Sequence, residues 1–158
     1  INLKALKQEQ VRAEVARLED LKRKVENRIA ASERLSTMAS QIKLDMTRDG
    51  LRIQIVDEHN RPMFASGSAV VQPYMRELLR EIGLVLAERL VAGGGLPSQA
   101  RVDALHVAMA AVHGMDYLLT WNCRHIANAA LRGKIEELCR EAGFEPPTIC
   151  TPLELPKE

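Results

Sequence analysis

Aromatic side chains are scarce in this sequence, because Phe, Trp and Tyr together make up 3% of its 158 residues. A surface that stacks the bases of single-stranded nucleic acid needs several such rings, so we expect no stacking platform. The formal net charge is +1, which leaves no broad basic field to hold a polyanion. The composition therefore predicts no nucleic-acid partner.

Long apolar runs and a disulfide framework are also missing. No run is long enough to cross a membrane, and the first residues pass straight into a charged helical pattern. We therefore expect neither a membrane span nor a signal peptide. The three cysteines, Cys123, Cys139 and Cys150, are too few and odd in number for a disulfide scaffold. We interpret them as small buried side chains in a reducing compartment.

The remaining composition is that of a globular protein, with 46% hydrophobic and 27% charged residues. The length suits one domain with an aliphatic core. From Leu3 to about Ser40 the pattern predicts one long helix. Its apolar positions alternate in steps of four and three, as in a coiled-coil seam. These positions are Val11, Val15, Leu18, Val25 and Ile29, with Lys22 on the seam.

Such a polar helix needs a partner for its apolar stripe. Two interpretations stay open: the stripe packs on its own domain, or residues 1–47 form a helix that dimerises with a second copy.

Further on, Asp49-Gly50 predicts a turn, 51–56 a half-exposed strand, 57–62 a turn and 63–64 a short return strand. Pro73 then begins a helix that runs to about Leu90.

Residues 1–86 carry a string of short motifs in order. They are Ile42–Thr47, Gly50–Asp57, Asn60–Phe64, Ser66–Ala69 and Pro73–Arg76. This stretch resembles the periplasmic region of the MotB family of flagellar stator proteins. The resemblance implies a helix that leads into the first strand and first helix of an OmpA-like fold. The family's membrane span and its peptidoglycan-gripping helix have no counterpart here, so no peptidoglycan-binding residue is carried over.

The second half alternates helices and short strands. A breaker segment at 92–97 precedes a helix from Ser98 to Gly114. We expect Val102, Leu105, Met109 and Val112 on the buried face of that helix. Further elements are predicted in chain order as a strand at 115–121, a helical stretch at 124–131, a helix at 133–143 and a strand at 148–151.

The segments Asp103–Ala108, Asp116–Asn128 and Pro147–Pro152 resemble the C-terminal half of a PIN domain, the fold of VapC-like toxin ribonucleases. The resemblance implies acids that bind Mg²⁺ or Mn²⁺, and Asp103 matches one of them. Asn122 stands where many members carry another acid. One carboxylate and one amide hold a divalent ion poorly, so we expect a vestigial site and no cofactor unless that site is active. By analogy, Asp57 ends a strand in a similar place.

Other groups of polar residues and glycines give weaker evidence for a functional site. His106, His113, Cys123 and His125 match no familiar zinc spacing, and the glycines at 93–95 have neither a phosphate-loop nor a dinucleotide-loop spacing. We expect ordinary structural roles for all of them.

The predicted fold is α/β: a long N-terminal helix, then a small three- or four-stranded, mostly parallel sheet flanked by helices. Strand 51–56 is expected to pair with strand 116–121. Both lie in one expected domain, 48–158, which is recombined from a MotB-like segment (48–86) and a PIN-like segment (87–158).

Two truncated half-folds meet inside one amphipathic helix, which favours an engineered chimera without catalytic or ligand-binding activity. The alternatives are a residual Mg²⁺-dependent ribonuclease and a MotB-like dimerising cell-envelope module. A natural fusion stays open, as does the compartment, since the two resemblances point to periplasm and cytosol.

Overall fold

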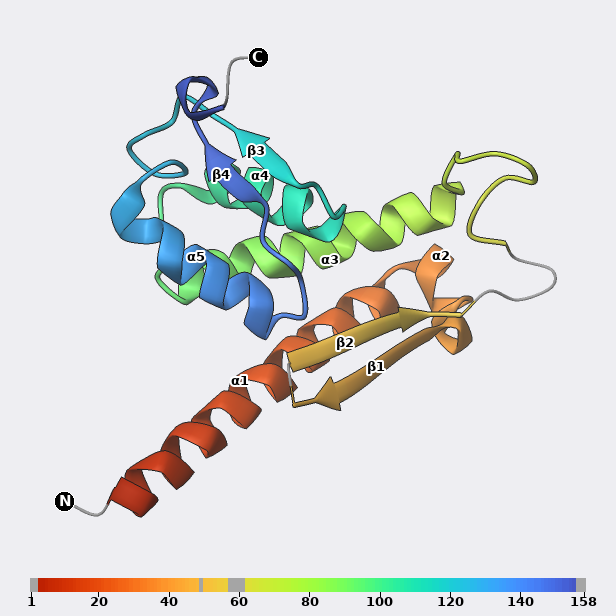
Figure 1. Cartoon of the computed structure of the whole chain (residues 1–158). Helices are drawn as coiled ribbons and strands as arrows, with labels where there is room; N and C mark the ends of the chain where they lie inside the picture. The colour runs from red at the N-terminus through yellow and green to blue at the C-terminus, as the bar shows by residue number, and fades with distance from the viewer. Residues whose placement is uncertain (1–2, 49, 57–61, 156–158) are drawn as a thin grey trace.

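Helices dominate the chain in the computed structural model, which describes residues 3–48, 50–56 and 62–155 (Figure 1). In chain order the helices are α1 (Leu3–Ala31), α2 (Glu33–Ser36), α3 (Pro73–Ala92), α4 (Arg101–Val112) and α5 (Ala129–Glu141), with 3₁₀ turns η1 (Ala39–Gln41) and η2 (Pro152–Glu154). The strands are β1 (Ile42–Thr47), β2 (Gly50–Ile55), β3 (Tyr117–Leu119) and β4 (Thr148–Cys150). The predicted α/β class and the long N-terminal helix are confirmed.

The strands form two separate sheets of two, in the part of the chain that the structure describes. β1 and β2 make an antiparallel hairpin whose register joins Ile42 to Ile55 and Thr47 to Gly50. β3 and β4 are parallel, with Leu118 beside Ile149. The expected single sheet of three or four strands, with 51–56 beside 116–121, is therefore wrong. β2 pairs with its neighbour in sequence, because a short connection costs less closure entropy than a long one.

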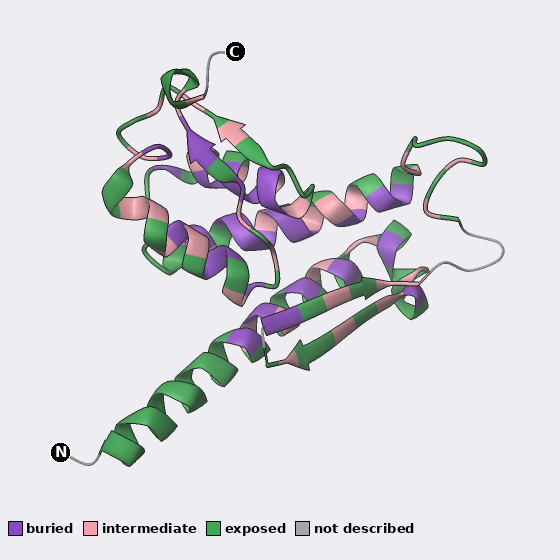
Figure 2. Ribbon diagram, in the orientation of Figure 1, coloured by how far each residue is buried: buried purple, intermediate pink, exposed green. Residues whose placement is uncertain are grey.

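The N-terminal helix ends at Ala31, nine residues before the expected Ser40. Ser32 ends it by acting as the N-cap of α2, where its side chain accepts a hydrogen bond from the N–H of Leu35. The 1–47 segment thus also contains α2, η1 and β1. The stripe of α1 is buried only in its second half, at Leu18, Leu21, Val25 and Ile29. Leu21 faces inward there in place of the predicted Lys22, and the first half of α1 projects with exposed side chains (Figure 2).

α3 is the central helix of the fold. It begins at Pro73 as predicted, continues two residues past Leu90, and buries an apolar face along its length. It contacts α1 on one side and α4 and α5 on the other. Every other helix longer than one turn therefore packs against α3.

The buried face of α4 differs from the prediction. Val102 is exposed, whereas the inward residues are Ala104, Val107, Ala108, Ala110 and Ala111. Small side chains let α4 approach α3 closely, and a Cβ added at Gly83 of α3 would lie 2.6 Å from the sulfur of Met109. Close helix packing therefore selects the alanine face over the larger aliphatic one.

The C-terminal half has one helix where two helical stretches were predicted. α5 runs through Gly133 without a break, and its N-cap Asn128 accepts a hydrogen bond from the N–H of Ala130. The predicted strands at 115–121 and 148–151 are confirmed in shorter form as β3 and β4. The predicted return strand 63–64 is reduced to one bridge between Phe64 and Val71. Most of the predicted 57–62 turn, including Asp57, lies outside the described residues.

One hydrophobic cluster joins the two halves of the chain. It contains buried residues from α1, α2, β2 and α3, together with others from α4, α5 and β4. Within the described ranges no helix is long and apolar enough to span a bilayer. The fold thus packs the segments before and after residue 86 around one shared core.

Candidate functional site

The two site residues predicted from the sequence meet at a histidine. Asp103 lies in the first turn of α4, and His125 lies in the loop that follows β3. His125 Nδ1 is 2.8 Å from Asp103 Oδ2, and the two side chains are 18% and 20% exposed. A carboxylate can only accept, so the imidazole Nδ1–H is the donor of this hydrogen bond.

Asn122 holds the backbone of the same loop. Its Oδ1 accepts from the N–H of His125 at 3.0 Å, and its own N–H donates to Thr120 Oγ1 at 3.0 Å. Its carbonyl accepts from the N–H of Ala127 at 2.9 Å. Asp103 and Asn122 are thus brought together through His125, which sequence reasoning treated only as a zinc candidate. The signal was the asparagine three residues before the histidine, because an Asn side chain commonly accepts from a backbone N–H two or three residues further on.

This arrangement holds the loop after β3 against α4. One oxygen of Asp103 already contacts His125, and Asn122 contributes its amide oxygen to the loop backbone. No group of three or more His, Cys, Asp or Glu side chains in the described ranges is placed to hold a metal ion. His106 and His113 instead line a hollow beside β3. The geometry therefore gives Asp103 a positioning role, and a catalytic role for it stays a prediction.

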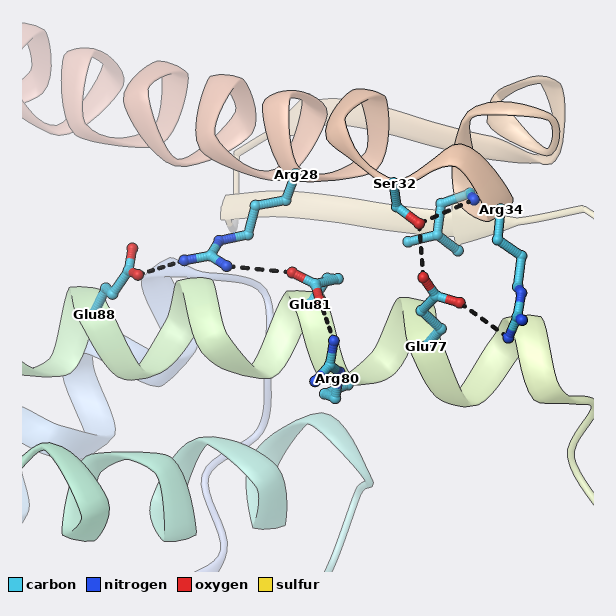
Figure 3. Close-up of polar contacts among 8 residues, drawn as sticks. Arg28, Ser32, Arg34, Glu77, Arg80, Glu81 and Glu88 are labelled. Carbon is cyan, nitrogen blue, oxygen red and sulfur yellow. Dashed lines mark hydrogen bonds and ion pairs between the residues drawn. The ribbon is translucent and has the colours of Figure 1, made fainter.

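A second polar cluster lies between α1 and α3, and we call it the α1–α3 seam (Figure 3). Arg28 of α1 contacts Glu81 at 3.2 Å and also Glu88. One turn further on, Ser32 donates to Glu77 at 2.7 Å. Arg34 adds an ion pair to that same glutamate at 3.4 Å. The seam limits how far α1 and α2 can slide along α3, because Arg28 reaches two acids of α3 and Ser32 and Arg34 share the third, Glu77.

An ion pair also joins α5 to the central helix α3. Glu141, at the end of α5, binds Arg89 of α3, and the two side chains are 13% and 12% exposed. Arg17 of α1 lies 4.0 Å from the same carboxylate. One acid at the end of α5 therefore meets cations from both long helices, α1 and α3.

The three cysteines are free and differ in exposure. Cys139 and Cys150 are buried as predicted, whereas Cys123 is exposed, which corrects the expectation for that residue. Burial raises the pKa of the Cys139 thiol from its ordinary value of 9.0 to about 12, because the thiolate would lose its hydration. Cys139 is therefore unsuited to act as a nucleophile, and no side-chain hydrogen bond among the described residues identifies a general base for Cys123.

Over about half of its length the chain is similar to bacterial motility proteins. Motility protein B of Escherichia coli strain K12 is 44% identical to it over 85 residues, which make up 54% of this chain. Motility protein B of Escherichia coli O157:H7 matches to the same extent. The matched part is 27% of each relative, so the chain spans about a quarter of the length of these curated proteins. No family model matches the chain.

The matched length agrees with the segment in which the MotB resemblance was identified, residues 1–86. The similarity supports that resemblance and does not bear on the PIN-like segment or on an engineered origin. Both of the latter stay predictions from the sequence.

Proposed function

We propose that the N-terminal half, from α1 through α3, is a motility-protein-B-like module of the bacterial cell envelope. The observation that carries the proposal is the 44% identity over 85 residues to motility protein B of Escherichia coli. The proposed role is mechanical and architectural rather than enzymatic. In this proposal the C-terminal half, with its Asp103–His125 contact, supports the module through the shared core.

The packing of the N-terminal half supports treating it as a unit. α1 contacts α3 and both strands of the hairpin, and α2 contacts α3 as well. The α1–α3 seam adds ion pairs from Arg28 of α1 and Arg34 of α2 to three acids spaced along α3. Individual exposed ion pairs contribute little stability, but a series of them defines one relative position of two helices.

We also propose that the projecting half of α1 associates with a second copy. Val11 and Val15 are exposed and continue the stripe whose next members, Leu18 and Val25, are buried against the core. An apolar stripe that continues beyond its own domain is the geometry of a short coiled coil. This is the dimerisation that the sequence left open as one of two alternatives.

The module proposal is tested by transplantation. Residues 1–86 replace the matching 85 residues of motility protein B in an Escherichia coli strain that lacks its own copy, and swimming is scored on soft agar. The proposal predicts that swimming is retained, because the contacts of α1 with the hairpin and with α3 up to residue 86 are carried over together.

A matched variant controls for folding. Val25→Glu in the transplanted segment places a charge at a buried position of α1 and is expected to abolish swimming. Loss of swimming with the unsubstituted segment, although the hybrid protein accumulates to the normal level in the membrane fraction, would contradict the proposal.

A further inference from the structure

One edge of the β3–β4 sheet is open. β3 has β4 on one side, and no strand of the described chain lies on its other side. The carbonyl of Asp116 and the N–H of Thr120 both bond to β4. In a parallel ladder the residues between such partners direct their backbone groups to the opposite edge. The N–H and C=O groups of Tyr117 and Leu119 therefore point to the open side.

Apolar side chains gather on this strand. Every second residue from 115 to 121 is large, apolar and exposed: Met115 by 56%, Tyr117 by 58%, Leu119 by 49% and Trp121 by 65%. The chain has only five aromatic residues, and two of them are exposed here. A contiguous apolar patch of this kind marks an interaction surface more often than an isolated exposed residue does.

The edge also has none of the features that keep exposed strands apart. Natural sheets protect their edges with lysine, proline or a bulge. Residues 115–121 contain no lysine, arginine or proline, and Asp116 is the one charged residue among them. The carbonyl of Asp116 is directed at β4 rather than at the open edge. Nothing in this segment opposes the addition of another strand.

We propose that β3 pairs antiparallel with β3 of a second copy, around a two-fold axis at Leu118. This register sets Tyr117 opposite Leu119 and Met115 opposite Trp121 of the second copy. The backbone groups that point outward in each copy then meet as hydrogen-bonded pairs. Aromatic–aliphatic pairs across strands and sulfur–aromatic contacts are both favourable.

The segment is complementary to itself, and this is what selects a second copy as the occupant. Asp116 falls opposite Thr120 in the proposed register, so the two acids do not face each other. A hollow of about 440 Å³ lies between α4 and β3, and Met109, Met115 and Leu118 are among its lining residues. Trp121 of the second copy arrives next to Met115, at the side of this hollow. The two sheets then form one sheet of four strands in the order β4–β3–β3–β4.

The proposal is tested by sedimentation equilibrium on the full chain over about a hundredfold range of concentration, with Trp121 fluorescence recorded in parallel. Trp121 is the chain's only tryptophan, so its emission reports this edge alone. We expect reversible self-association whose midpoint coincides with a blue shift of the emission. A monomer at every concentration would overturn the proposal.

Matched charge substitutions locate the contact. Leu119→Lys places a charge at the open edge, whereas Val102→Lys does the same at an exposed valine of α4. We expect Leu119→Lys to raise the dimer dissociation constant by at least about tenfold and Val102→Lys to leave it unchanged. Circular dichroism establishes that both variants are folded, and Tyr117→Thr serves as a second edge variant if Leu119→Lys does not fold.

A third variant separates this contact from the proposed coiled coil of α1. Val15→Lys charges the projecting half of α1 and leaves β3 untouched. If Val15→Lys abolishes association and the fluorescence shift while Leu119→Lys preserves both, the β3 proposal is overturned and the α1 contact stands. If Leu119→Lys removes the fluorescence shift and Val15→Lys does not, the β3 proposal is supported whatever the fate of α1.

Discussion

At the scale of single residues, burial determines how reactive each of the three cysteine thiols is. Cys139 is fully buried with a pKa raised to about 12, whereas Cys123 is exposed. We expect an aromatic disulfide reagent at neutral pH to label Cys123 in the folded protein. Cys139 and the buried Cys150 should react only after unfolding. Labelling followed by mass spectrometry of peptides measures this, and rapid reaction at Cys139 in the native protein would contradict its placement.

The raised pKa of Cys139 also affects the stability of the fold at high pH. A thiol whose pKa is raised on folding contributes stability that is fully present below its ordinary value of 9.0 and is lost as the pH rises toward about 12. We therefore expect the free energy of unfolding to fall above pH 9, and Cys139→Ala to weaken that fall. Urea unfolding at a series of pH values checks this. An equal loss in the variant would assign the effect to other groups.

The ion pair between Glu141 and Arg89 gives a second residue-scale prediction. Removing one member of a largely buried pair leaves the other charge without compensation. We expect Glu141→Gln to lower the free energy of unfolding by about 3 kcal/mol. Glu136→Gln is the control, because Glu136 forms an exposed pair with Arg140 on the same helix and exposed pairs contribute about 0.5 kcal/mol or less. Equal effects in urea unfolding would show that Glu141 is no more than a surface acid.

At the scale of elements, the hairpin meets the end of α5 through glycine. Gly143 has a φ of +84°, and a Cβ added there would lie 1.8 Å from the carbonyl oxygen of Leu51. Gly94 has a similar φ of +76°, but a Cβ there meets nothing within 4 Å. Both alanine variants share the conformational cost, so their difference isolates the clash. We expect Gly143→Ala to be less stable than Gly94→Ala by about 2 kcal/mol or more in urea unfolding. Equal stabilities of the two alanine variants would mean that β2 does not pack against the turn at Gly143.

Element positions were predictable where the signal was local. Pro73 fixed the start of α3, and Gly114, with a φ of +63°, fixed the end of α4. The end of α1 was also signalled locally by Ser32, but the uninterrupted charged pattern beyond it favoured a longer helix. Helix faces and strand partners depend on tertiary packing. The alanine face of α4 and the β1–β2 hairpin were therefore missed.

The candidate site was predictable only in part for the same reason. Asp103 and Asn122 were selected through a family resemblance, and the structure places both next to His125. Their contact depends on how the loop after β3 packs on α4, across 22 positions of sequence between Asp103 and His125. The residue pattern within α4 or within the loop after β3 does not show that Asp103 and His125 come into contact.

At the scale of the whole molecule, two sequence segments share one core. The buried cluster runs from Leu18 and Val25 in α1 to Ile135 in α5 and Ile149 in β4. The contact of Gly143 with β2 and the approach of Arg17 to Glu141 at 4.0 Å cross between the segments at the same end of the fold. A chain held together in this way should unfold as one cooperative unit.

Differential scanning calorimetry at low protein concentration tests that claim most directly, because it compares two enthalpies from one transition. A shared core predicts a single peak in which the calorimetric enthalpy equals the van't Hoff enthalpy. Glu141→Gln should lower the temperature of that whole peak. Two peaks, or a calorimetric enthalpy about twice the van't Hoff value, would show that the N-terminal and C-terminal halves unfold separately and would contradict a shared core.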